Sequence, residues 1–382
     1  MGGEAQKTLK AMVEEFERKN PDIKIELVGM GNYDALAQKL LGAVAVENPP
    51  TIAQMYENWT TQLHTAGQLE YLEDYIRGPN GLSEDELSDI YPNLLENNRW
   101  DNKILTLPFN KSVPVYYYNV NILKQFDYDS FPRTWTEFRN MCKKITRKTQ
   151  TGETKIWATA NGTDIWIFGS MLFQRGGRFL NKEDGEPEFN NPIGVAVLTF
   201  QVDLILKDSV QVTARGRNPM EDFLLGKIAT VTGSSTWRAP IYGQENFPVG
   251  MAPIPVEGQP AAIIYGTNIG IFKKATRAEK DAAWRFIKWF IVPEQQVKWS
   301  LGTWYVPIHR QCLEHPLLKE RFAQTPGLLA AYRQMEYGVF EPRGLKWLVG
   351  RKTLVEELEA ASLGMKTPQQ ALTDAANRYR QN

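Results

Sequence analysis

The sequence contains few cysteines and histidines, no long apolar run and no excess of charge of either sign. Only Cys142 and Cys312 occur in 382 residues, so a disulfide framework is excluded and the redox compartment stays open. The three histidines have no metal-site spacing and no cysteine pair beside them, which argues against zinc and, with the absence of a cofactor motif, predicts no cofactor. No segment approaches the roughly 20 apolar residues that a membrane span needs.

The charge balance argues against a polyanionic partner. Lysine plus arginine number 44, as do aspartate plus glutamate, so no net field attracts nucleic acid and no nucleic-acid partner is expected. The apolar fraction of 42% and the charged fraction of 23% are those of a globular protein. At roughly 100 to 200 residues per domain, the length predicts two domains. A signal peptide is absent from this chain, so composition alone leaves a cytoplasmic protein and a processed exported one open.

The hydrophobic periodicity alternates between helical and strand-like segments, which predicts an α/β protein. Apolar residues recur at helical spacing over 4–20 until Pro21, and residues 23–28 then alternate apolar and polar like a half-buried strand. Thr134 and Glu137 form a capping-box pattern at the start of a predicted helix. Further strands are expected over 51–56, 104–109, 113–119, 227–232 and 261–272, the last interrupted at a glycine. Further helices are expected over 33–45, 59–67, 134–149, 275–292 and 352–380, the last broken at 366–368.

Two crossovers between domains are placed at the turn 110–112 and near 264. They predict a first lobe of residues 1–111 plus 264–309 and a second lobe of residues 112–263 plus 310–382. Glu57 follows a predicted strand, and in open α/β sheets ligands gather outside the carboxyl ends of strands. This position makes Glu57 a candidate site residue.

Several segments resemble one family from one end of the chain to the other. They are Gly31-Asn32-Tyr33, Gln54-Met55-Tyr56-Glu57, the run from Pro108 to Asn119, Gly233-Ser234-Ser235, Ala262 to Gly266, Tyr305-Val306-Pro307-Ile308, and Glu356 to Glu359 with Lys366 to Leu372. They resemble the extracellular solute-binding proteins of ABC importers in the maltose-binding-protein-like cluster, nearest to the branch that binds glycerol 3-phosphate or glycerophosphodiesters.

The resemblance implies a two-lobed α/β periplasmic-binding-protein fold of type II whose lobes are joined by crossover strands. It implies a non-enzymatic receptor that closes on a small polar ligand and delivers it to ABC transporter membrane subunits. A monomer is expected, in the periplasm or outside the cell, with a membrane anchor possible in a full-length precursor. By comparison with the family, the first N-terminal strand is expected to be missing, because residues 1–4 already resemble the turn that opens the first helix.

The resemblance also implies the site residues. Positions that contact the ligand in that branch correspond to Tyr33, Glu57, Ser112, Ser234, Gly266, Tyr305 and Arg351, and one of two stacking tryptophans corresponds to Trp166. The second tryptophan position is Thr163 here, which departs from the family pattern. Asp164 is added as an acceptor for a ligand hydroxyl or a choline-like cation.

A glycerophosphate needs donors for its phosphate and acceptors for its hydroxyls. Arg351 can donate a bidentate pair to phosphate oxygens, and an ionised Glu57 only accepts, which suits hydroxyls. The tyrosine and serine hydroxyls and the Gly266 N–H add donors.

Two other functions stay open. The first is a receptor of the same fold for a di- or oligosaccharide, because 11 tryptophans and 15 tyrosines offer stacking faces. The second is a glycoside hydrolase that uses Glu57 and Asp164 as its carboxylate pair. The sequence has no nucleophile elbow, P-loop or dinucleotide fingerprint, which disfavours an enzyme.

Overall fold

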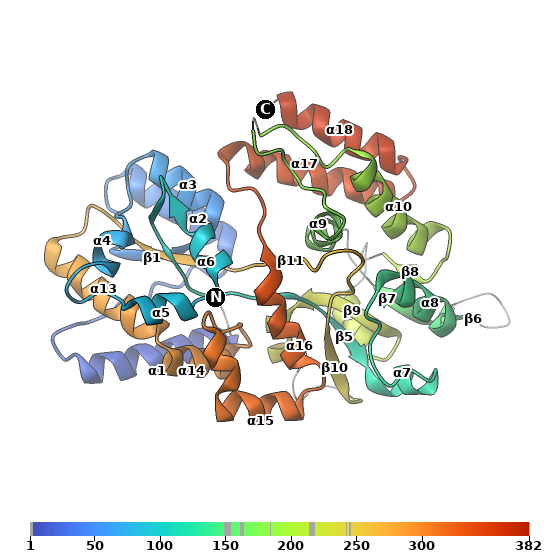
Figure 1. Ribbon diagram of the computed structural model, residues 1–382, viewed down its shortest axis with the longest axis horizontal. Helices are drawn as coiled ribbons and strands as arrows, with labels where there is room; N and C mark the ends of the chain where they lie inside the picture. The colour runs from blue at the N-terminus through green and yellow to red at the C-terminus, as the bar shows by residue number, and fades with distance from the viewer. Residues whose placement is uncertain are drawn as a thin grey trace. The chain divides into compact units, whose positions relative to one another are not determined.

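The chain divides into two compact units. The computed structural model describes residues 3–148, 154–160, 164–183, 185–213, 218–241, 243 and 246–381. Unit 1 comprises Met1–Ser112 and Tyr265–Arg321, and unit 2 comprises Val113–Ile264 and Phe322–Asn382. Each unit has its own sheet and its own covering helices (Figure 1), which confirms the predicted α/β class.

Unit 1 is mostly helical around a small sheet. In chain order its elements are α1 (Gly3–Lys19), α2 (Tyr33–Ala45), β1 (Ile52–Met55), α3 (Glu57–Thr65), α4 (Leu72–Ile76), α5 (Glu84–Asp89), α6 (Pro92–Asn97), β2 (Arg99–Trp100), β3 (Lys103–Ile104), β4 (Leu107–Pro108), β12 (Asn268–Ile271), α13 (Arg277–Ile291), α14 (Pro293–Thr303), the 3₁₀ turn η2 (Arg310–Glu314) and α15 (Pro316–Gln324), in which the chain passes to unit 2.

The sheet of unit 1 has the order β1-β12-β4 with both pairings antiparallel. Met55 lies opposite Asn268, and Asn268 lies opposite Pro108. The residues that follow β1 and β4 therefore meet beside the start of β12. Apolar side chains from α2, α3, β1 and the segments around them form a buried cluster in this unit: Leu40, Met55, Trp59, Leu63, Leu69, Trp100, Leu105 and Phe272.

The strand predicted over 23–28 is wrong. Those residues form no strand, and in this segment only Ile23 is buried while Val28 is 65% exposed. The Ile25 N–H donates to Oε1 of Glu17 on α1 (2.8 Å) and not to a neighbouring strand. Alternation gives a strand only where another strand offers its edge, and within the described residues none does so here.

Unit 2 is built on a larger mixed sheet. Its elements are β5 (Pro114–Asn119), α7 (Val120–Gln125), α8 (Trp135–Ile145), β6 (Arg147–Lys148), β7 (Thr154–Ala160), α9 (Ile165–Gln174), α10 (Pro192–Leu206), β8 (Gln211–Val212), α11 (Pro219–Leu224), β9 (Ile228–Ser234), η1 (Ser235–Trp237), α12 (Arg238–Ile241), β10 (Val249–Pro253), β11 (Ala262–Ile263), α16 (Leu328–Tyr332), η3 (Arg333–Tyr337), β13 (Gly338–Val339), α17 (Leu345–Ser362) and α18 (Pro368–Gln381).

The main sheet of unit 2 has the order β10-β5-β9-β7-β6, and β8 pairs with β7. β5 is buried along its whole length, which fits its near-continuous aromatic and aliphatic sequence. The predicted capping box at the start of α8 is confirmed, with Thr134 and Glu137 bonding reciprocally. α17 packs against α18, and the two helices lie alongside each other within this unit (Figure 1).

Two boundaries differ from the sequence prediction. The return to unit 2 lies after Arg321 and not at 309, because the segment between is fixed to unit 1. His309 bonds Asp89 and the Ile291 carbonyl, and the Arg321 guanidinium bonds the Leu301 carbonyl and lies over Trp304. The last long helix begins at Leu345, seven residues ahead of the predicted 352, so Arg351 lies inside α17.

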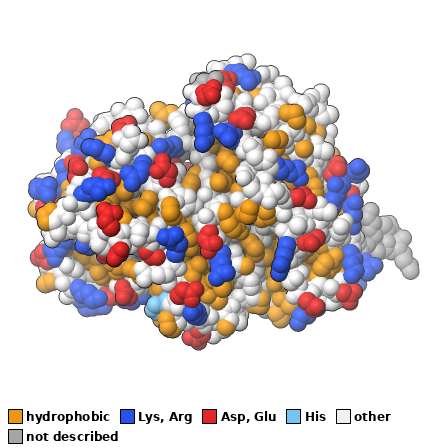
Figure 2. Space-filling model, in the orientation of Figure 1, with side chains coloured by type: hydrophobic (Ala, Val, Ile, Leu, Met, Phe, Trp, Pro, Cys, Tyr) orange, Lys and Arg blue, Asp and Glu red, His pale blue; other side chains and the backbone are white. Residues whose placement is uncertain are grey.

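Basic and acidic side chains are interspersed on the face drawn in Figure 2, as expected for equal numbers of both. Both cysteines are buried and form no disulfide. Among the described residues, no helix is long and apolar enough to cross a membrane.

Candidate ligand-binding site

Polar side chains of unit 1 gather at one end of its sheet. Glu57 opens α3 directly after β1, Asn268 opens β12, and Asn110 and Lys111 follow β4. The register that places Met55, Asn268 and Pro108 side by side brings these residues together. The expectation that Glu57 lies beyond the carboxyl end of a strand is confirmed.

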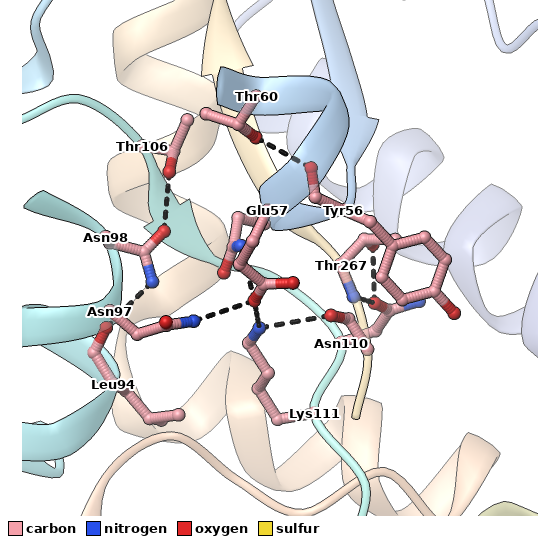
Figure 3. A network of polar contacts seen from close by, with 12 residues as sticks. Tyr56, Glu57, Thr60, Leu94, Asn97, Asn98, Thr106, Asn110, Lys111 and Thr267 are labelled. Carbon is pink, nitrogen blue, oxygen red and sulfur yellow. Dashed lines mark hydrogen bonds and ion pairs between the residues drawn. The ribbon is translucent and has the colours of Figure 1, made fainter. Parts of the chain in front are cut away.

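The Glu57 carboxylate is held by three donors on one of its two oxygens. Oε1 accepts from Nδ2 of Asn97 (2.8 Å), Nδ2 of Asn268 (3.1 Å) and Nζ of Lys111 (3.3 Å), as Figure 3 shows for this network. Oε2 has no hydrogen-bond donor among the residues that the structure describes, and the side chain keeps 18% of its surface exposed. The first turn of α3 also favours a negative charge at this position. The group is thus a fixed acceptor with one open oxygen.

Lys111 is the countercharge of Glu57 and is completely buried. Its Nζ also donates to the Gly266 carbonyl (3.1 Å), and burial lowers the pKa of Lys111 below its usual value while Glu57 acts in the opposite direction. Sequence reasoning missed this lysine, since lysine is normally a surface residue. The one sequence feature that marks Lys111 is its position in a segment of apolar and small polar residues. In the structure this segment is buried.

Tyr33 and Tyr305, which are both predicted to contact the ligand, lie next to each other in unit 1. Their hydroxyls lie 3.3 Å apart, and Nδ2 of Asn110 donates to the Tyr33 hydroxyl (3.2 Å). The Tyr305 ring stacks on Trp299 with 5.7 Å between centroids, and burial with the nearby Tyr33 raises the pKa of Tyr305 well above its usual value. The Tyr305 phenol therefore remains a neutral hydrogen-bonding group, and Asn110 connects the two tyrosines to the segment that carries Lys111.

Ser112 and Gly266 lie where the chain passes between the units. The Ser112 N–H donates to the Tyr265 carbonyl (3.1 Å), and Ser112 is buried. Gly266 has a φ of +105°, and a Cβ there would lie 1.6 Å from the Asn110 carbonyl oxygen. Only glycine fits this close approach, so a backbone requirement already accounts for Gly266.

In unit 2, Asp164 and Trp166 lie at the start of α9. Oδ1 of Asp164 accepts from the Trp166 N–H (2.8 Å) as the N-cap of the helix. Nε1 of Trp166 donates to Oε1 of Glu341 (3.0 Å), and Trp166 is half-buried. The predicted stacking tryptophan is thus held in place by a carboxylate. Thr163, at the other tryptophan position, lies outside the described residues.

Arg351 also binds the Glu341 carboxylate. Its Nε donates to Oε2 of Glu341 (2.8 Å), and its guanidinium lies over the Trp166 ring, 5.5 Å from the centroid. Nε1 of Trp347 also donates to Oε2 of Glu341 (2.9 Å). Neither terminal nitrogen of Arg351 donates a hydrogen bond within the described part of the chain, and 34% of the side chain is exposed. The guanidinium is oriented through Nε and presents its terminal fork.

Ser234 lies at the end of β9, paired with Pro114 at the start of β5. Its Oγ is 2.9 Å from Oγ1 of Thr236 and accepts from the Thr236 N–H (3.3 Å), so it caps η1. Trp237 follows, with 42% of its surface exposed.

The structure groups the predicted residues by unit: Tyr33, Glu57, Ser112, Gly266 and Tyr305 in unit 1, and Asp164, Trp166, Ser234 and Arg351 in unit 2. Lys111, Asn97 and Glu341 were missed. Glu341 had no sequence signal, because it lies in an irregular segment between β13 and α17 and its partners are distant in sequence.

Asp164 is expected to titrate with a pKa of about 6, because burial raises the pKa of its carboxyl and the nearby Arg351 charge only partly offsets this. Between its ordinary value of 3.8 and about 6, the folded state binds more protons at this group than the unfolded state. The free energy of unfolding should therefore fall as pH rises through that window. We expect Asp164→Asn, which keeps the cap acceptor, to abolish this slope and a carbon NMR titration to give the midpoint directly. A midpoint below 4 contradicts the burial argument.

Comparisons with known proteins give one consistent fold. A family model described as bacterial extracellular solute-binding protein matches residues 11–327. The sn-glycerol-3-phosphate-binding periplasmic protein UgpB of Salmonella typhimurium strain LT2 is 29% identical over 402 aligned positions that cover 100% of this chain and 90% of the relative.

Two solved structures are similar over almost the whole chain. UgpB from Mycobacterium tuberculosis in complex with glycerophosphocholine has a TM-score of 0.84 at 20% identity, with 98% of this chain and 95% of that chain covered. The sugar-binding protein MalE from Xanthomonas citri has a TM-score of 0.86 at 22% identity, with 100% and 95% covered. The fold is that of the type II periplasmic binding proteins, as predicted.

Proposed function

Because this chain belongs to the family of bacterial extracellular solute-binding proteins, we propose that it binds a glycerophosphate-type ligand for an ABC importer. The observation that carries the proposal is the state of Arg351. Its Nε is committed to Glu341 while its terminal fork stays open, which is the geometry that binds two oxygens of one phosphate.

Glu57 supplies the complementary half of the recognition. Three donors saturate Oε1, so Oε2 is the oxygen that accepts from a ligand hydroxyl. Tyr33 and Tyr305 add neutral hydroxyls next to this network, and Ser112, Ser234 and the Gly266 N–H are proposed as further donors. The donors and acceptors of these groups match the chemistry of a ligand with an anionic end and a polyol end.

The mechanism is binding without chemical conversion. A ligand favours the conformation of the protein for which it has the higher affinity, and it shifts the population toward that conformation. The membrane subunits of the importer then recognise the closed, loaded protein. We propose a monomer that acts in the periplasm or outside the cell and has no enzymatic activity. Turnover of a candidate glycoside in the presence of the protein would contradict the last point.

A di- or oligosaccharide is the second candidate ligand. The exposed indole of Trp237 favours it, because a sugar ring stacks on such a face. A neutral sugar, however, makes no use of the open fork of Arg351.

Ligand-induced stabilisation tests the proposal. At a ligand concentration about 100-fold above the Kd, binding adds roughly 2.7 kcal/mol to the free energy of unfolding, which raises Tm by about 5 °C for a protein of this size class. We expect such a shift in a thermal melt with glycerophosphocholine or glycerol 3-phosphate and none with maltose or trehalose. If only the neutral sugars raise Tm, the ligand is a sugar and the phosphate assignment is wrong.

A further inference from the structure

Glu341 is the centre of a charged cluster that no sequence motif predicts. Its two oxygens accept from Nε1 of Trp166, Nε1 of Trp347 and Nε of Arg351, all within 3.0 Å. These donors come from the start of α9 and the first two turns of α17, so one carboxylate fixes both the tryptophan and the arginine of the candidate site. The Glu341 side chain keeps 18% of its surface exposed, so its charge remains close to whatever binds at Arg351.

The cluster carries more negative than positive charge. Glu341 contacts Arg351 directly, and Asp164 interacts electrostatically with both of them. With Asp164 ionised above a pKa of about 6, these three groups sum to one net negative charge at neutral pH. The charge of Arg351 is therefore already compensated before a ligand arrives.

The geometry points to Glu341 as a specificity-determining residue that selects a glycerophosphodiester with a cationic alcohol, such as a quaternary ammonium, over glycerol 3-phosphate. This inference rests on the proposed function and narrows it. It assigns the residue two actions on the same ligand. Glu341 orients the Arg351 fork toward the phosphate, and with Asp164 it supplies negative charge for the ligand's cation.

The ligand charges explain the selection. A phosphomonoester carries about −1.5 to −2 near neutral pH, whereas a diester carries a single charge. A dianionic ligand comes close to two carboxylates and to only one arginine, whose charge Glu341 already balances. The repulsion at short range makes its binding free energy less favourable. A zwitterionic diester brings one phosphate charge to Arg351 and places its own cation near the carboxylates, where the attraction is favourable.

Titration calorimetry at pH 7.5 with three ligands separates these contributions. The probes are glycerol 3-phosphate, glycerophosphoglycerol as a monoanion without a cation, and glycerophosphocholine. For the unmodified protein we expect affinity to rise in that order, with about tenfold between the first and the last. Glu341→Gln and Asp164→Asn should each bring that ratio close to one, because each removes one negative charge.

Two comparisons distinguish selectivity from simple loss of structure. Glu341→Asp keeps the charge but is too short to reach all three donors, so it should weaken every ligand while the ratio between them stays unchanged. Asp164→Asn keeps the helix cap, so a change of ratio there cannot be ascribed to misfolding of α9. The inference is overturned if the unmodified protein prefers glycerol 3-phosphate, or if neither neutral variant changes the ratio. Failure of the proposed function gives a different result, in which none of the three phosphates binds the unmodified protein.

Discussion

Replacing Glu57 with glutamine is expected to lower the free energy of unfolding by about 2 to 3 kcal/mol and to weaken ligand binding by about thirtyfold. The stability loss arises because the Lys111 ammonium, whose side chain is fully buried, loses the carboxylate with which it pairs at 3.3 Å. The binding loss arises because an amide replaces the charged acceptor of the ligand hydroxyl. Urea unfolding measures the first effect and titration calorimetry the second.

The double variant Glu57→Gln with Lys111→Met separates the two effects. Removing both charges leaves no uncompensated ion in the interior, so stability should recover to within about 1 kcal/mol of the unmodified protein. Ligand binding should remain as weak as in the single variant. If the double variant is as unstable as Glu57→Gln alone, the pair is not the source of the loss.

The Glu57→Gln defect should also shrink with rising pH. Burial lowers the pKa of Lys111, so at alkaline pH the folded state loses this proton before the unfolded state does. The unfolded state then binds more protons, and the free energy of unfolding rises with pH until the ordinary lysine value is reached. A matched control is Glu70→Gln, which breaks the Glu70–Lys280 pair of the same unit (2.6 Å) where both side chains are partly exposed. That variant should change stability by less than about 1 kcal/mol and leave binding unchanged.

Arg351→Ala is expected to weaken binding of a glycerophosphate by several hundredfold, roughly 3 to 4 kcal/mol. Two charge-assisted hydrogen bonds to phosphate are lost together, and each is worth about 1.5 to 3 kcal/mol before partial compensation by water. Glu341 also loses the charge that balances it at 2.8 Å. Titration calorimetry with glycerophosphocholine gives the change directly.

Arg351→Lys and Lys352→Ala complete that series. Lysine keeps the positive charge but lacks both the Nε donor and the paired terminal N–H donors of a guanidinium. It should therefore recover only part of the lost affinity. Lys352, the next residue on α17, is exposed, and its replacement should have no effect beyond the error of the titration. Equal losses for Arg351→Ala and Lys352→Ala would mean that long-range charge, and not a phosphate contact, drives binding.

Local signals in the sequence predicted much of the fold. Helical periodicity located α1 and α13, a capping box located α8, and a strand-like run interrupted at a glycine located the segment around β12. Each of these elements forms because of interactions among its own residues, such as the capping box of Thr134 and Glu137. The strand expected over 23–28 failed for the opposite reason, since a strand also needs a partner and the partner is not a local property.

The residues of the candidate site also divide into those with a local sequence signal and those without one. Glu57 was predictable because its place after β1 is a local feature, and the resemblance located Arg351 and Trp166. Lys111 and Glu341 were not predictable, because each acquires its role from residues far away in the sequence. Lys111 meets Glu57 only through the register of β1, β12 and β4, and Glu341 meets Trp166 across 175 positions of the chain.

The central claim is that one fixed carboxylate of unit 1 accepts the hydroxyls of a phosphate-bearing ligand. A double cycle tests it most directly, with calorimetric affinities of the unmodified protein and of Glu57→Gln for glycerophosphocholine and for an analogue that lacks the two glycerol hydroxyls. We expect Glu57→Gln to weaken binding of glycerophosphocholine strongly and of the analogue hardly at all, a coupling of about 1.5 to 2 kcal/mol. Equal weakening of both ligands would show that Glu57 does not contact the hydroxyls.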